Sequence, residues 1–79
     1  MSSSSVEVEV ESSNYYVNKN PQDNGDHEVH REDCEKLPSP ANREYLGHFD
    51  CCEDAVEKAK QIFSQSNGCL YCSEKCHTN

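Results

Sequence analysis

Two short groups of cysteine and histidine have spacings that suit a metal ion. Cys69 and Cys72 form a C-x2-C pair, whose spacing lets two thiolates from one tight turn reach a single tetrahedral ion. His30 and Cys34 form an H-x3-C pair, which can present one nitrogen and one sulfur from a second turn. Zinc suits thiolate and imidazole ligands in a closed four-coordinate site. The sequence therefore predicts a Zn2+ site on His30, Cys34, Cys69 and Cys72.

The chain contains six cysteines, and other uses of them stay open at this point. Three disulfides would suit a disulfide-stapled binding protein of an oxidising compartment. A C-x2-C pair can also be a redox pair, although the thioredoxin-like form requires a βαβ setting that this chain lacks. An alkyl-accepting thiol at Cys34, Cys69 or Cys72 is a further alternative. Because a closed zinc site leaves no open position for water, we do not expect an enzyme.

The remaining cysteines have less defined roles. Cys76 and His77 follow the C-x2-C pair and are reserve ligands, but adjacent residues rarely bind one ion together, so at most one of them would join the site. Cys52 is expected to be a small buried thiol on a helix, with a Cys52–Cys76 disulfide as the alternative. Cys51 points elsewhere on that helix, and we expect no role for it.

A helix from about residue 51 to residue 64 is the best-defined element that could position these ligands. Asp50 is a suitable N-cap, and Glu53 three residues later completes a D-x-x-E capping box. Residues 66–68 (Ser-Asn-Gly) are a suitable stop. Apolar residues form one continuous stripe at helical spacing along this segment: Cys52, Ala55, Val56, Ala59, Ile62 and Phe63.

Short extended segments are expected at residues 15–17, 27–30 and 45–49. In an extended strand His27 faces opposite to His30, so we expect it at the surface or supporting a ligand. Residues 6–10 alternate valine and glutamate, which is the pattern of a possible edge strand. The expected fold class is α+β, with a small antiparallel sheet and one main helix, stapled by the Cys/His metal site.

Length and composition explain why a staple is needed. Leu, Ile, Val and Phe together number only 12 of 79 residues, and the net charge is -8, a combination typical of disordered chains. The length allows one small domain, and domains of this size usually need a disulfide or a metal to fold. We expect residues 1–13 to be a flexible N-terminal tail and residues 14–79 to be a single small metal-binding domain.

The charge balance excludes several kinds of partner. Seven Lys and Arg residues are scattered among 15 Asp and Glu residues, so neither nucleic acid nor an anionic membrane surface is expected. The N-terminus lacks the basic start and apolar stretch of a secretory signal, and no apolar run could span a membrane. We therefore expect a cytoplasmic monomer, with an unknown protein partner and a role as an interaction or scaffold module. A reducing cytosol also favours metal binding over disulfides.

A set of residues spread over the chain follows one recognisable order: Tyr16-Val17, His30-x3-Cys34, Asn42-Arg43-x-Tyr45-Leu46-x-x-Phe49, Ala55, Ala59 and Gly68-Cys69-x-x-Cys72. In this order residues 15–77 resemble the Ada-type metal-binding domain, a small bacterial zinc domain. They also resemble a small bacterial family of stand-alone proteins with H-E-V-H-x3-C, L-G-x-F and N-G-C-x2-C-x3-C-H segments.

This resemblance implies a compact α+β unit with zinc on His30, Cys34, Cys69 and Cys72. The Ada-type site uses four cysteines, and the cysteine that accepts a methyl group corresponds to His30 of this chain. An imidazole nitrogen is not an equivalent nucleophile, and an acidic chain does not suit DNA phosphates. The resemblance therefore implies the metal scaffold without the methyl transfer.

Overall fold

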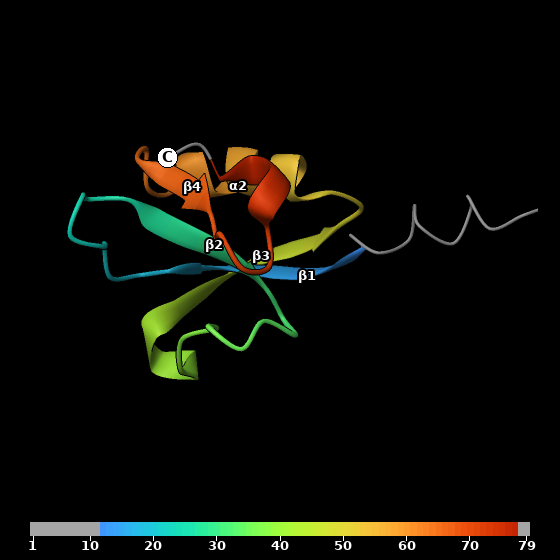
Figure 1. Cartoon of the computed structure of the whole chain (residues 1–79), viewed down its shortest axis with the longest axis horizontal. Helices are drawn as coiled ribbons and strands as arrows, with labels where there is room; N and C mark the ends of the chain where they lie inside the picture. The colour runs from blue at the N-terminus through green and yellow to red at the C-terminus, as the bar shows by residue number, and fades with distance from the viewer. Residues whose placement is uncertain (1–11, 78–79) are drawn as a thin grey trace, which may run out of the picture.

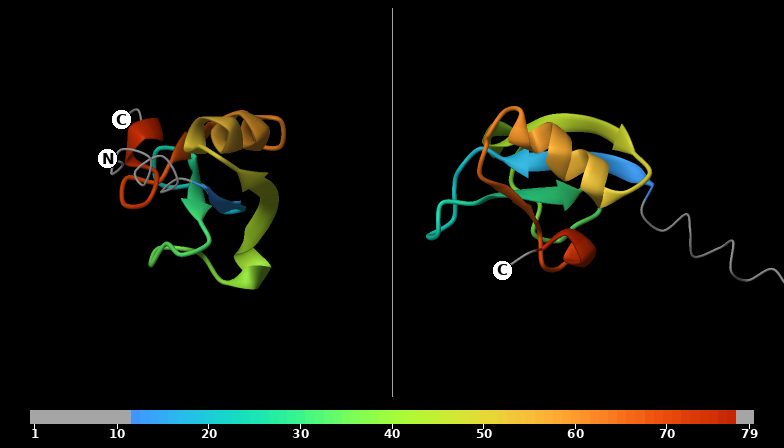
Figure 2. Two further views of the ribbon diagram at one scale, coloured as in Figure 1. Left: turned by 90° about the vertical axis from the view of Figure 1, so that its right-hand side faces the viewer. Right: turned by 90° about the horizontal axis from the view of Figure 1, so that it is seen from above.

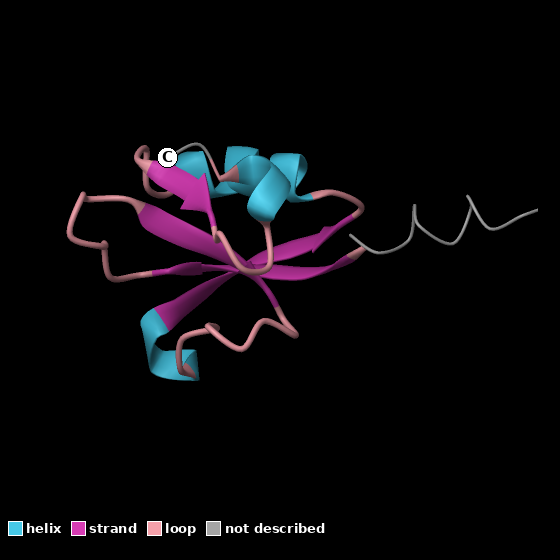
Figure 3. Ribbon diagram, in the orientation of Figure 1, coloured by secondary structure: helices cyan, strands magenta, loops and turns pink. Residues whose placement is uncertain are grey.

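Four strands and one α-helix form the regular structure of residues 12–77, the part of the chain that the computed structural model describes (Figures 1 and 3). This arrangement confirms the predicted α+β class. The strand predicted over residues 6–10 lies outside the described residues. In chain order the elements are β1 (Ser13–Asn18), β2 (His27–Arg31), the 3-10 turn η2 (Pro40–Asn42), β3 (Arg43–Phe49), α2 (Cys52–Lys60), β4 (Ser66–Gly68) and the 3-10 turn η3 (Glu74–Cys76).

The sheet is mixed, with the strand order β3-β1-β2-β4. β1 pairs antiparallel with both β2 and β3, whereas β4 pairs parallel with β2. The prediction of a purely antiparallel sheet is therefore wrong at β4. Residues 66–68 were expected to end the helix, because glycine can take the left-handed conformation found after a helix C-terminus. The crossover through β3 and α2 brings this segment back beside β2, and such a long connection is what parallel pairing requires.

Helix α2 lies over one face of the sheet, as the two turned views in Figure 2 show, and the hydrophobic core lies between them. Alternation along β1 points Tyr15 and Val17 into this core, and β2 contributes Val29. The buried face of the helix consists of Cys52, Ala55, Val56 and Ala59. Phe49 and Phe63 pack partly buried against the same cluster. Six of the 12 Leu, Ile, Val and Phe residues of the chain thus contribute to one small core.

The helix is shorter than predicted at both ends. It begins at Cys52 after Cys51, which is extended and makes no side-chain cap hydrogen bond. The predicted cap, Asp50, instead accepts a hydrogen bond from the Ser12 hydroxyl at 3.1 Å. The helix ends at Lys60, where the chain must turn toward β4, and Ile62 is consequently exposed rather than part of the apolar stripe.

The third predicted strand is present as β3, an edge strand with an irregularity at its centre. Tyr15 pairs with Gly47 whereas Tyr16 pairs with Tyr45, so Leu46 is the extra residue of a bulge. Gly47 has a φ of 127°, a conformation that favours glycine. The bulge leaves Leu46 buried in the core. Among residues 12–77, α2 is too short and too polar to traverse a bilayer.

Candidate metal centre

The four predicted ligands come from the ends of two adjacent strands. His30 lies near the end of β2, and Cys34 lies in the turn that follows it. Cys69 comes directly after β4, and Cys72 follows in the next turn. Because β4 pairs in parallel with β2, both strands end at the same edge of the sheet, and the two turns face each other there. The β2–β4 pairing is therefore what joins the H-x3-C pair to the C-x2-C pair.

The distances between the ligand atoms suit a tetrahedral ion. With zinc–sulfur bonds of about 2.3 Å and a zinc–nitrogen bond of about 2.0 Å, two ligand atoms of such a site lie about 3.5–3.8 Å apart. The Nδ1 atom of His30 lies 3.6 Å from the Sγ atom of Cys34 and 3.9 Å from that of Cys72. The sulfur atoms of Cys34 and Cys69 are 4.0 Å apart, and all four ligand atoms lie within 4.8 Å of one another.

Backbone hydrogen bonds shape the two ligand turns. The N–H of Cys34 donates to the carbonyl of Arg31 at 3.0 Å, and the N–H of Ser73 donates to the carbonyl of Cys69 at 2.8 Å. The sulfur atoms also accept backbone hydrogen bonds: Cys72 from Arg31 and Cys34 from Lys36, both at 3.4 Å. N–H groups directed at sulfur favour the thiolate form, which is the form that binds metal.

Three of the four ligands are buried, and Cys72 is partly exposed. A pocket of about 370 Å³ opens beside the centre and is lined in part by Cys34 and Cys72. A buried set of three sulfurs and one imidazole nitrogen, reached from one side, matches the ligands of a structural zinc site. The residues present therefore fit a metal ion.

The pKa values of the three ligand thiols are shifted in different directions. Hydrogen bonding from Cys72 lowers the pKa of the Cys69 thiol, and the same contact with Cys69 raises the pKa of the Cys72 thiol. Burial raises the pKa of Cys34. Metal binds the thiolate form of cysteine, so an ion bound here would take the place of the thiol protons.

Glu28 is a neighbour of the centre that sequence reasoning missed. Its Oε1 atom lies 3.6 Å from the Nε2 atom of His30, the ring nitrogen that faces away from the thiols. Burial raises the pKa of the Glu28 carboxyl, and Cys69 adds to this effect, whereas His30 and His77 oppose it. The available signal was its position two residues before His30, which places both side chains on one face of a strand.

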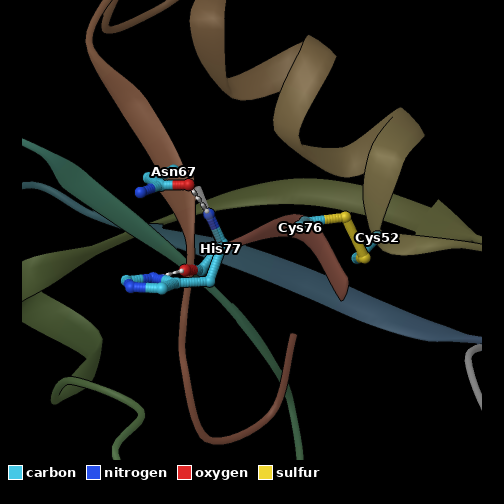
Figure 4. Close-up of a disulfide and its surroundings, with 5 residues drawn as sticks. Cys52, Asn67, Cys76 and His77 are labelled. Carbon is cyan, nitrogen blue, oxygen red and sulfur yellow. Dashed lines mark hydrogen bonds between the residues drawn. A yellow bond between two sulfur atoms is a disulfide. The ribbon is translucent and has the colours of Figure 1, made fainter. Parts of the chain in front are cut away.

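The reserve ligand Cys76 is not part of the cluster, because it forms a disulfide with Cys52 (Figure 4). The expectation that Cys52 is a free buried thiol is therefore wrong, and the alternative pairing is the one observed. The bond joins the first turn of α2 to η3, and both cysteines are buried in the core cluster. His77, the other reserve ligand, also stays out of the cluster and holds its Nδ1 atom 3.0 Å from the carbonyl oxygen of Gly68.

The other histidine and cysteine residues lie apart from the centre. His27 stacks on Phe63 with ring centroids 4.0 Å apart and bonds through Nδ1 to the carbonyl of Asn18, so it neither lies free at the surface nor supports a ligand. Cys51 is a free, partly exposed thiol.

Comparison of the chain with models of protein families, with curated proteins and with solved structures finds no match. The candidate metal centre is therefore defined by its own geometry alone.

Proposed function

We propose that this protein is a small zinc-binding domain in which the ion is structural and the domain serves as an interaction or scaffold module. The observation that carries the proposal is the cluster of His30, Cys34, Cys69 and Cys72, whose ligand atoms lie within 4.8 Å of one another. Three sulfurs and one nitrogen favour zinc over magnesium or calcium, which prefer oxygen ligands. The resemblance to the Ada-type domain implies metal ligands at the same four positions, with His30 in place of one cysteine.

The proposed structural role follows from the number of protein ligands and from the strands that carry them. Four protein ligands complete a tetrahedral shell and leave no position for a substrate or a reactive water. The ion would tie the end of β2 to the end of β4, and β4 is only three residues long. Structural zinc contributes about 10–16 kcal/mol of apparent binding free energy in finger peptides. That amount exceeds the usual stability of a whole small domain, so zinc would decide whether this chain folds.

The loop between the last two ligands supports an interaction role. Leu70 and Tyr71 lie between Cys69 and Cys72, and their side chains are 47% and 68% exposed. The ammonium group of Lys36 lies 5.0 Å from the centre of the Tyr71 ring. Exposed apolar side chains on a loop held at both ends are suited to contact a partner protein, because such a loop loses little conformational freedom on binding. A monomer that contacts an unknown protein partner stays our prediction.

The disulfide bears on the compartment in which the protein works. Disulfides persist in oxidising compartments and are rare in the cytosol. A cytoplasmic location therefore stays a prediction, and the Cys52–Cys76 bond is the observation that counts against it. A free-thiol count on freshly isolated protein distinguishes the two cases: four thiols with the bond and six without it.

The direct test is metal content together with folding. We expect elemental analysis of the purified protein to give one zinc per chain, and we expect a strong chelator to abolish the circular dichroism signal of the fold. Replacing a ligand, as in Cys72→Ser, should lower the zinc content, whereas Cys51→Ala should leave it unchanged. A folded protein that carries no metal and does not respond to the chelator would refute the proposal.

A further inference from the structure

Glu28 and His30 lie two residues apart on β2, so their side chains project from the same face of the strand. Val29 between them points to the opposite face and is fully buried in the core. The Oε1 atom of Glu28 and the Nε2 atom of His30 are 3.6 Å apart. The strand itself therefore places a carboxylate beside the imidazole of the candidate metal centre.

The second nitrogen of His30 requires an acceptor. Its Nδ1 atom faces the sulfur atoms of Cys34 and Cys72, at 3.6 Å and 3.9 Å. An ion bound at Nδ1 leaves the single proton of the neutral ring on Nε2. Nε2 is buried and has no hydrogen-bond partner among the described residues. Leaving a buried N–H unsatisfied costs about 1–3 kcal/mol. A hydrogen-bond acceptor that moves close to Nε2 would therefore stabilise the site.

Glu28 is suited to be that acceptor because its surroundings hold it in place. Its side chain is only 19% exposed, and its backbone is in register with Asn67 of β4. Because most of this side chain is covered, it has little room to swing out to solvent, and its Oε1 atom stays close to the Nε2 atom of His30.

We propose that Glu28 is a positioning residue of the metal centre: its carboxylate accepts the Nε2–H of His30 and so fixes Nδ1 as the ligating atom. The inference rests on the proposed function, since it concerns the loaded centre. A contraction of under about 1 Å brings the two atoms from 3.6 Å to the distance of a charge-assisted hydrogen bond. Such carboxylates orient a ligating imidazole and raise its basicity, and their loss typically weakens metal binding about 10–100-fold.

The test compares zinc affinity, measured by competition with a chelator, in the full-length protein and three variants. We expect Glu28→Ala to weaken zinc binding about 10–100-fold. Glu28→Gln should weaken it less, because the amide oxygen still accepts the proton but carries no charge. The matched control is Glu35→Gln, which removes the same charge from an exposed residue next to Cys34 and should leave the affinity within about threefold.

A second measurement separates positioning from a general effect on folding. In the zinc-loaded wild type, nitrogen-15 NMR should show His30 with a metal-bound Nδ1 and a slowly exchanging, downfield Nε2–H. This proton signal should move upfield or disappear in Glu28→Ala and persist in Glu35→Gln. Equal affinities for wild type, Glu28→Ala and Glu28→Gln, or an unchanged proton signal, would overturn the role of Glu28 alone. A wild type that binds no zinc would overturn the proposed function and this inference with it.

Discussion

The Cys52–Cys76 disulfide should account for a large share of the stability of this domain. The two cysteines are 24 residues apart in the sequence, so the bond closes a loop of about 25 residues. In the chain-entropy treatment, such a loop closure stabilises the folded state by about 3.5 kcal/mol at 25 °C. At about 0.05–0.15 kcal/mol per residue, a chain of 79 residues has a total stability of about 4–12 kcal/mol. Removal of the bond therefore takes away more than a quarter of that stability.

The variant to measure is Cys52→Ala/Cys76→Ala. Both sulfur atoms belong to the buried core, so lost packing adds to the entropic effect. We expect a loss of at least about 3 kcal/mol and, at about 4–8 °C per kcal/mol, a fall in Tm of at least about 12–24 °C. Thermal unfolding is followed by far-ultraviolet circular dichroism at one fixed free zinc concentration. The zinc contribution then cancels between variants of equal zinc affinity.

Cys51→Ala is the control for this experiment. It removes the neighbouring thiol, which is free and only partly exposed, and leaves the disulfide intact. Its Tm should stay within a few degrees of the wild-type value. A double variant whose Tm also stays within a few degrees would refute the reasoning. It would mean that the metal and the core already hold η3 against α2.

Three further predictions concern the surroundings of the metal. Zinc binding at pH 8 should release about two protons from the three cysteine ligands, because thiols of a metal-free, unfolded chain have an ordinary pKa of about 8.5 and must lose their protons to bind the ion. The apparent affinity should therefore rise with pH, and calorimetry in two buffers would contradict this if no protons were released. Gly68→Ala should lower the free energy of unfolding by about 1–3 kcal/mol in urea titrations, since the new Cβ would lie 2.7 Å from the Cβ of Cys76. A stability equal to wild type would show that the C-terminal turn moves freely. Tyr71→Ala should lower the free energy of unfolding by less than about 1 kcal/mol and leave zinc affinity unchanged, because the residue is 68% exposed and its cation–π contact is with Lys36. A tenfold weaker affinity would show that the ring covers the centre.

The candidate site was predictable from sequence because its two halves are local. H-x3-C and C-x2-C each bring two ligands together within one turn, and their residue types are specific for soft metals. That the H-x3-C pair and the C-x2-C pair lie side by side was not predictable in the same way. It depends on β4, a strand of three polar residues whose composition favours a turn. Only its pairing with β2 makes it a strand.

The disulfide and the helix ends depended on tertiary contacts. Cys52 was correctly expected to be buried on the helix, but nothing local indicates that a turn 24 residues later packs against it. The capping box around Asp50 was a sound local pattern, yet the Asp50 carboxylate bonds to Ser12, from the start of the described chain. The helix also ends early because the chain has to reach β2. Local rules thus identified the elements, and long-range pairing decided their limits.

The proposed ion and the disulfide join different parts of the chain, with consequences for a chain that has been cut. A single protease cut in the exposed segment around Ser39 would leave Cys52 and Cys76 on the same piece, so no disulfide would join the two pieces, and the proposed metal centre, the strand pairing and the shared core would hold them together. A cut between Cys52 and Cys69 would leave pieces that stay covalently joined. Two separate polypeptides that meet near Ser39 should then assemble more tightly with zinc than without it, which makes this loop a natural place to split the protein into a metal-dependent pair.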